Sequence, residues 1–581
     1  MKLVYTVLFS FLITFLFAQG VEDKFLQNKT VTHQEAIVFY QQLAKAYPQS
    51  KLFEYEKTDI GLPLHLFVIS KDKDFNTASL KDKNKRIILI NNGIHPGEPC
   101  GIDASMNLAK DLLTNKDMAK LLDNTVVCII PFYNVGGSLN RGCCSRVNQN
   151  GPEEYGFRGN ARNLDLNRDF IKCDSENARA FSNLFHIWKP DVFIDTHATN
   201  GADYRHTMTV IPTQYNKLHP LLGNFMKNTM LPQLYEKMKS KEYPMCPYVN
   251  SVKSTPDEGI IDFLETPRYS TGYAALFNTI GFVSEAHMLK SFPERVKSTY
   301  AFLTSVLEFV NQESELIGKL KKEADKDILT RTEFPVSWTL DTTKHELFNF
   351  MGYEAKYKKS NVTSMERLYY DTLEPYTKPI KYFTTYFPDI IVNKPEYYIV
   401  PQAWKEVIER LKWNQVAVQR LKKDTVLTVQ VYYIEDYKTP EKPFEGHYLH
   451  SNIKTRIETQ NINYNKGDYV ISVNQVQNRY IIETLEPQAT DGFFAWNFFD
   501  GILQQKEWFS PYVFEEKAEE ILKNNPELKK EFEEKQKQDE VFLSNSWAQL
   551  YFIYQNSVYF EKGYLRYPVA RVNEKVALPL E

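Results

Sequence analysis

The sequence predicts an α/β fold with a mixed, mostly parallel sheet flanked by helices, followed by a C-terminal domain rich in β structure. Apolar runs alternate with amphipathic helical stretches up to about residue 312, the pattern of helices packed on the faces of a sheet. Polar residues suited to chemistry stand at the ends of several apolar runs, where open α/β sheets place their sites. After residue 335, short aromatic and β-branched runs separated by turn residues indicate β structure.

The elements of the first part follow from hydrophobic periodicity and turn residues. Residues 86–90 form an apolar run that breaks at Asn-Asn-Gly, and residues 140–162, rich in Gly, Asn and Arg, indicate a long loop beside a site. We expect further strands at 51–58, 64–70, 125–131, 191–197 and 279–284. We expect helices at 34–46, 102–113, 218–239, 293–312 and 315–331.

The later part differs because its apolar runs are short and aromatic. We expect strands at 335–340, 382–387, 397–400, 426–434, 469–473 and 480–485. An amphipathic helix at 403–413 interrupts them, and beyond Pro511 the chain turns helical and charged, with Pro526 breaking that helix. We therefore predict a first domain at 19–314, a linker helix at 315–334, and a β-rich domain at 335–581 that ends in charged helices.

The N-terminus has the pattern of a secretory signal peptide over residues 1–18. Met1-Lys2 precedes fifteen mostly apolar residues, and Ala18 offers a small residue at the cleavage point. The run is too short for a comfortable membrane span, and no other stretch reaches that length. We expect an exported protein, periplasmic or secreted, with no stable membrane span in the mature chain.

The charge balance argues against a nucleic-acid-binding protein, and the cysteine positions argue against a protein held together by disulfides. The chain has 70 Lys and Arg against 73 Asp and Glu, with no basic stretch typical of a nucleic-acid site, so we expect no nucleic-acid partner. Six cysteines in an exported chain could pair, but Cys143 and Cys144 are neighbours, and a bridge between neighbours is strained. We expect no full disulfide framework, and Cys100 to be a buried thiol rather than a metal ligand.

Two polar residues stand on the turn that follows the run at 86–90. His95 and Glu98 are three residues apart, with Pro96-Gly97 between them. An imidazole nitrogen and a carboxylate oxygen on one short loop suit two of the three protein ligands of a catalytic zinc, and the third is commonly a distant His. His197 fits that place because it ends the apolar run at 191–197, and ligands gather at the carboxyl ends of strands.

Two further segments complete a pattern that is known from one enzyme family. In chain order the motifs are His95-x-x-Glu98, Asp165-x-Asn167-Arg168, His197 and Glu285, the last at the end of an apolar run. All of them occur in the order of the zinc carboxypeptidase family of carboxypeptidase A, which residues 32–310 resemble. The resemblance implies a carboxypeptidase-like α/β fold and one zinc ion per chain.

The resemblance also implies a role for each motif. The metal ligands would be His95, Glu98 and His197. Asp165 would orient His95 through its other ring nitrogen. Glu285 would be the general base that takes a proton from the zinc-activated water and passes it to the leaving amine. Asn167 and Arg168 would hold the terminal carboxylate of the substrate, which suits a planar guanidinium.

Two more roles follow from the same resemblance. An arginine should help hold the oxyanion, and Arg146 is the nearest fit, with Arg141 as a rival. A tyrosine should cap the substrate terminus; of Tyr269 and Tyr273 we take Tyr273 as the candidate. Arg268 either reads an acidic substrate side chain or makes an ion pair within its loop, and we favour the ion pair.

We therefore predict an exported zinc metallocarboxypeptidase whose substrate is a peptide with a free C-terminus. An alternative is a zinc amidase that uses the same chemistry on peptidoglycan stem peptides or other non-standard amides. A third class, a non-catalytic binding protein on the same fold, is disfavoured because a lapsed enzyme has no physical reason to retain all three ligands together with Glu285.

Overall fold

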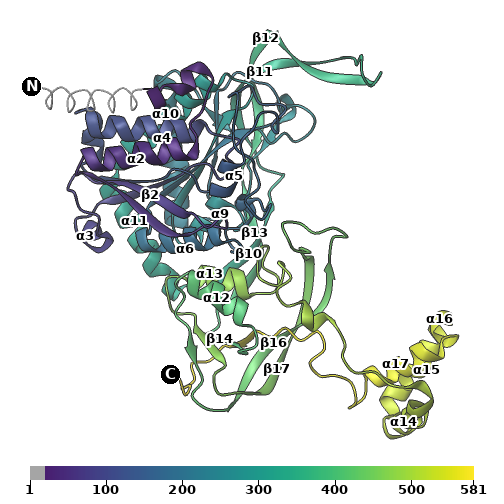
Figure 1. The fold of residues 1–581 in the computed structure, drawn as a ribbon. Coiled ribbons are helices and arrows are strands. Elements are labelled where there is room, and N and C mark those ends of the chain that lie inside the picture. Colours follow the sequence, from purple (N-terminus) through teal and green to yellow (C-terminus); the bar gives the residue numbers. More distant parts are fainter. Residues whose placement is uncertain (1–19) are drawn as a thin grey trace, which may run out of the picture.

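The computed structural model describes residues 20–581, so the predicted signal peptide at 1–18 lies outside the described residues. The first part of the chain is a mixed, mostly parallel sheet with helices on its faces, as predicted (Figure 1). The strands are β1 (Ser50–Lys57), β2 (Pro63–Ile69), β3 (Arg86–Asn91), β4 (Thr125–Ile130), β5 (Val192–Thr199), β6 (Met208–Pro212), β7 (Cys246–Pro247) and β9 (Ile280–His287). They lie in the order β1-β2-β4-β3-β5-β9-β6-β7, and the central run from β4 to β9 is parallel.

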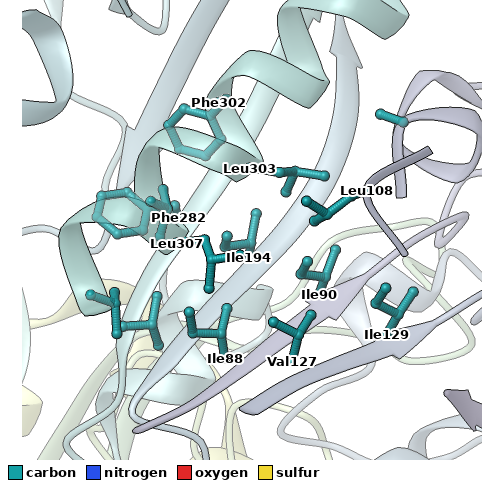
Figure 2. Close-up of a cluster of buried hydrophobic side chains, with 14 of the residues drawn as sticks. Ile88, Ile90, Leu108, Val127, Ile129, Ile194, Phe282, Phe302, Leu303 and Leu307 are labelled. Atoms are coloured by element: carbon teal, nitrogen blue, oxygen red, sulfur yellow. The ribbon is translucent and has the colours of Figure 1, made fainter. Parts of the chain in front are cut away.

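Two apolar cores lie on opposite faces of this sheet because side chains alternate along each strand. On β3, Ile88 and Ile90 belong to one core, whereas Ile87 and Leu89 belong to the other. Figure 2 shows the first core, where the strand side chains pack against α4 (Cys100–Thr114) and α10 (Phe292–Gln312). Strands buried on both faces are rigid, so the loops at their carboxyl ends have a fixed base.

Local signals explain where the flanking helices begin and end. The capping box of Thr32 and Glu35 starts α2 (His33–Ala46), and Ser175 caps α6 (Glu176–Trp188). The helix predicted at 218–239 is instead α7 (Pro220–Phe225) and α8 (Leu231–Ser240), joined by a π turn. No helix among residues 20–581 is long and apolar enough to cross a membrane.

The later part is rich in β structure, as predicted, and it begins after α11 (Ser314–Thr330). Its strands are β10 (Glu333–Leu340), β11 (Glu346–Lys359), β12 (Glu366–Phe383), β13 (Tyr386–Asn393), β14 (Tyr397–Val400), β15 (Gln419–Arg420), β16 (Thr425–Lys438), β17 (Ser451–Tyr464), β18 (Tyr469–Ser472) and β19 (Ala570–Val572). The largest sheet has the order β15-β18-β14-β19-β16-β17. The hairpin of β11 and β12 extends from the body (Figure 1).

Helices also contribute to this part. They are α12 (Lys405–Trp413), α13 (Asn478–Leu485), α14 (Pro511–Asn524), α15 (Pro526–Gln538), α16 (Glu540–Leu543) and α17 (Ser546–Gln555). Pro526 begins α15 and separates it from α14, as predicted. The last four of these helices share a small core of their own and extend away from the rest of the chain (Figure 1).

The two parts of the chain share the second apolar core. Phe181 of α6 and Tyr273 of α9 (Ser270–Ala275) belong to it together with Leu411 of α12 and Tyr480 of α13. In addition, β12 pairs with the short strand β8 (Ile260–Ile261) of the first part. The later part therefore packs directly against the elements that carry the site.

One strand that the sequence analysis expected is a helix. The strand expected at 480–485 is part of helix α13, whose Ile481, Ile482 and Leu485 recur at helical spacing and enter the shared core. Cys143 and Cys144 form a disulfide despite being neighbours. The other four cysteines are free and buried, and Cys100 is one of them.

Candidate metal centre and active site

The first two predicted ligands lie on the loop between β3 and α4. The main-chain N–H of Glu98 donates to the carbonyl oxygen of His95 at 2.8 Å, so the loop folds back and brings both side chains to one side. Each residue is only 3% exposed. A glycine suits position 97, because a Cβ there would lie 2.8 Å from Cδ of Arg146 and 3.1 Å from the main-chain oxygen of Gly156.

The third predicted ligand reaches the same point from the sheet. His197 lies on β5, and its Nδ1 is 3.1 Å from Oε2 of Glu98. The Nδ1 atom of His95 is 3.3 Å from Oε1 of the same carboxylate. One ligand atom from each residue lies within 4.8 Å of the other two.

This donor set fits zinc. Two imidazole nitrogens and one carboxylate, with a fourth position left open, are characteristic of catalytic zinc sites. Nδ1 of His95 is buried and accepts or donates no hydrogen bond among residues 20–581, an orphaned state that a bound metal would relieve. Burial alone would raise the pKa of Glu98, but the charges of Arg146 and His95 outweigh burial and hold that pKa well below its usual range.

A carboxylate stands behind each histidine. Nε2 of His95 donates to Oδ1 of Asp165 at 2.8 Å, which directs Nδ1 toward the metal position. Nε2 of His197 lies 3.1 Å from Oδ2 of Asp195, a residue that the sequence analysis missed. Asp195 stands two residues before His197 on the same strand, so both side chains lie on one face of the sheet. This spacing could have indicated Asp195 as a neighbour of the His197 ring.

The pairing of strands β5 and β9 determines the position of Glu285. In the parallel ladder of β5 and β9, His197 lies opposite Glu285, so the carboxylate stands beside the metal ligands. Its side chain makes no hydrogen bond to the described residues and faces the cavity. Desolvation there, together with the charge of Glu98, raises the pKa of Glu285 to about 8 against the opposing effect of His197.

The three ligands and Glu285 line a cavity of about 470 Å³, within the range usual for small-ligand sites. Asn167 and Arg168 line it too, on the short 3₁₀ turn that follows Asp165. The Arg168 guanidinium lies 4.5 Å from the ring centre of Tyr269, a cation–π contact that holds it against the wall.

Two arginines line the cavity near the ligands. Arg146 donates to Oε1 of Glu98 at 2.7 Å and to the carbonyl oxygen of Ala198 at 3.3 Å. Arg158, which the sequence analysis did not weigh, donates through Nε to Asp165 at 3.0 Å and lies 3.5 Å from Glu98. Arg158 stands nine residues before Asn167 in the sequence.

Two arginines that the sequence analysis considered lie elsewhere. Arg141, the rival to Arg146, donates to the carbonyl oxygens of Val31 and Thr30 outside the cavity. Arg268 makes an ion pair, as favoured, but its partner is Asp491 of the C-terminal part, 2.6 Å away, and not a residue of its own loop.

The assignment of Tyr273 to the substrate is a correction. Its ring is fully buried in the shared core, and its hydroxyl donates to Asn414 at 2.6 Å, so it does not line the cavity. The tyrosines that do line the cavity are Tyr248 and Tyr269. Helix α9 turns Tyr273 toward α6 and the C-terminal part, which the local sequence did not reveal.

Comparisons of the sequence with known proteins point to one enzyme family. A profile of the zinc carboxypeptidase family matches residues 37–214. Carboxypeptidase 2 of Trichophyton equinum is 22% identical over 466 residues, which cover 75% of this chain and 78% of the relative. Carboxypeptidase 2 of Trichophyton rubrum is 22% identical over 449 residues, covering 72% and 75%. The solved structure of carboxypeptidase A from Helicoverpa armigera aligns with 52% of this chain and 75% of its own, at 14% identity and a TM-score of 0.36.

The family profile spans the metal loop, the Asp165-x-Asn167-Arg168 segment and His197, and the structure brings the side chains of all three segments to one cavity. His95, Glu98 and His197 are thus the zinc ligands. The domain that carries the site matches the zinc carboxypeptidase family over residues 37–214, and the chain is a metallocarboxypeptidase.

Proposed function

We propose that the enzyme binds the free carboxylate at the end of a peptide chain and hydrolyses the last peptide bond. The observation that supports this is that Asn167 and Arg168 share one cavity with the three ligands and Glu285. Nη1 of Arg168 donates to the main-chain oxygen of Asn167 at 2.7 Å, whereas its Nη2 makes no hydrogen bond to the described residues and is available to a carboxylate. The side-chain NH₂ of Asn167 likewise makes no hydrogen bond to the described residues, so it can donate to the same carboxylate.

The side chains then divide the chemistry between them. Zinc, when bound, supplies a Lewis acid that polarises the scissile carbonyl and lowers the pKa of a water molecule. Glu285 takes the proton of the attacking water and passes it to the leaving amine. Arg146 and Arg158 place positive charge beside the oxyanion. Asp165 holds the His95 ring through the nitrogen that faces away from the metal, and Asp195 stands beside the corresponding nitrogen of His197, where it can orient that ring.

The terminal carboxylate provides the test. Blocking it as an amide removes the group that Arg168 would hold, and the loss of a buried charged hydrogen bond costs about 2–5 kcal/mol. Cleavage of the amidated peptide should therefore be slower by roughly thirtyfold to several thousandfold. Equal kcat/KM for free and amidated peptides would favour an endopeptidase or an amidase on non-standard substrates.

We also propose that the protein is exported, to the periplasm or the medium. The support is the charged start, the apolar run and the small residue at position 18. N-terminal sequencing of the mature protein from its native host should find a chain that begins close to Gln19. A mature chain that still begins at Met1 would contradict export by cleavage.

A further inference from the structure

A turn of the C-terminal part reaches the segment that carries Asp165, Asn167 and Arg168. Residues 444–447 lie in the loop between β16 and β17, and the main-chain N–H of Asp165 donates to Oε2 of Glu445 at 2.7 Å. Among residues 20–581, Glu445 is the only one that accepts a hydrogen bond from this N–H. A carboxylate from the later part of the chain therefore fixes the backbone where the site segment begins.

The turn has an unusual conformation at Glu445. Phe444 and His447 exchange main-chain hydrogen bonds of 2.7 and 3.1 Å, so Glu445 and Gly446 are the two central residues of a tight turn. Both have positive φ, +51° and +83°, a conformation that is usual for Gly, Asn and Asp and unfavourable for a longer side chain. Residues held in such conformations cluster at functional sites. The conformation thus indicates that the glutamate is present for its carboxylate and not for the turn.

The two ends of the turn are anchored independently of that carboxylate. Phe444 stacks on Trp496 of the later part, with ring centres 6.2 Å apart. One ring nitrogen of His447 lies 2.6 Å from the carboxylate of Asp174 in the first part, and the other lies 2.6 Å from the side-chain oxygen of Asn497. Because none of these contacts involves the glutamate side chain, a substitution there should leave the turn in place.

The hydrogen bond acts on the substrate-binding residues more than on the metal. The Asp165 carboxylate is held separately, because it accepts hydrogen bonds from His95 at 2.8 Å and from Arg158 at 3.0 Å. The main chain that follows forms a single 3₁₀ turn, Leu166–Arg168, which carries both side chains proposed to bind the terminal carboxylate. Loosening the start of this turn should therefore disturb the grip on the substrate and leave the zinc ligands in place.

We propose that Glu445 is a positioning residue: its carboxylate holds the 3₁₀ turn so that Asn167 and Arg168 meet the terminal carboxylate of the substrate. The C-terminal part thus completes the substrate site as well as sharing the apolar core. The proposal rests on the function proposed above, because Glu445 acts through the two residues that bind the free terminus.

The test compares kcat/KM for one peptide with a free C-terminus and for the same peptide as an amide. Glu445→Ala removes the acceptor, and we expect the ratio of free to amidated peptide to fall about tenfold, mainly through a higher KM for the free peptide. Glu445→Gln keeps an acceptor oxygen at the same reach, so its ratio should stay within about threefold of the wild type. Both variants should keep one zinc per chain and a melting temperature close to that of the wild type.

The matched control is Glu441→Ala, the same change at an exposed position of the same loop, where the side chain contacts no site residue; it should leave the ratio unchanged. An unchanged ratio in Glu445→Ala, or an equal loss in Glu445→Gln, would overturn this proposal alone. Loss of zinc in Glu445→Ala would also overturn it, because the bond would then act on the metal. A wild type that cleaves the free and the amidated peptide equally would overturn the proposed function first.

Discussion

Glu285→Gln separates catalysis from metal binding. The carboxylate lies opposite His197 in the strand ladder, yet it makes no hydrogen bond to the described residues; Thr209 donates to the main-chain oxygen of Glu285 instead, at 3.2 Å. The substitution keeps the shape and removes only the ability to accept a proton. It breaks no structural contact and opens no cavity, so we expect stability within about 0.5 kcal/mol of the wild type.

The expected loss of rate follows from the role of a positioned base. Such a base contributes about 10²–10⁴-fold, which corresponds to about 2.7–5.5 kcal/mol of activation free energy. The carboxylate is not one of the three ligands, so the variant should retain one zinc per chain. Because Asn167 and Arg168 still hold the substrate, kcat should collapse while substrate affinity stays close to that of the wild type.

The assay combines steady-state kinetics on one free peptide with zinc content and melting temperature of the same preparation. Glu294→Gln, the same change at an exposed position of α10, is the control and should behave as the wild type. Near-normal turnover in Glu285→Gln would refute its role as base. Loss of zinc in this variant would show that Glu285 is a ligand.

Three further predictions follow. Asp195→Asn should weaken zinc binding by about ten- to a hundredfold in a competition with a chelator, because the substitution removes the carboxylate beside the His197 ring. Excess zinc should restore the activity of this variant. An unchanged zinc affinity would contradict a role of Asp195 in orienting His197. A chain ended after Arg331 should be insoluble because it exposes the shared core, and a soluble, active fragment would contradict that. His447→Gln should lower the melting temperature more at pH 6 than at pH 9. Burial lowers the pKa of His447, but the hydrogen bond and charge of Asp174 outweigh burial and raise that pKa, so the stability that this pair contributes is present below the pKa of the unfolded state and is lost as the pH rises through the pKa of the folded state. A difference in melting temperature that does not change with pH would contradict this prediction.

The sequence predicted the strands and the site residues at their ends because both depend on short local patterns. The apolar run of β3 and the turn after it place His95 and Glu98, and the apolar runs of β5 and β9 place His197 and Glu285 at strand ends. A parallel sheet then brings distant strand ends to one edge whatever the sequence between them. For this reason the zinc ligands could be named before the fold was known.

The features that the sequence analysis missed depend on contacts across the fold. Tyr273 lies on the short helix α9, whose buried face is decided by the C-terminal part and not by its own six residues. The segment 480–485 is apolar enough for a strand or a helix, and packing against the shared core selects the helix. The position of Arg158 depends on the path of the long loop, which periodicity does not describe.

We expect a zinc ion on His95, Glu98 and His197 to drive the removal of single residues from free C-termini. The decisive experiment is mass spectrometry of the products from a mixed library of peptides and muropeptides, with the enzyme first stripped of metal and then reloaded with one equivalent of zinc. We predict no products from the stripped enzyme and, after reloading, only peptides shortened from the C-terminus. Internal cleavage, release confined to non-standard amides, or full activity in the stripped enzyme would contradict the claim.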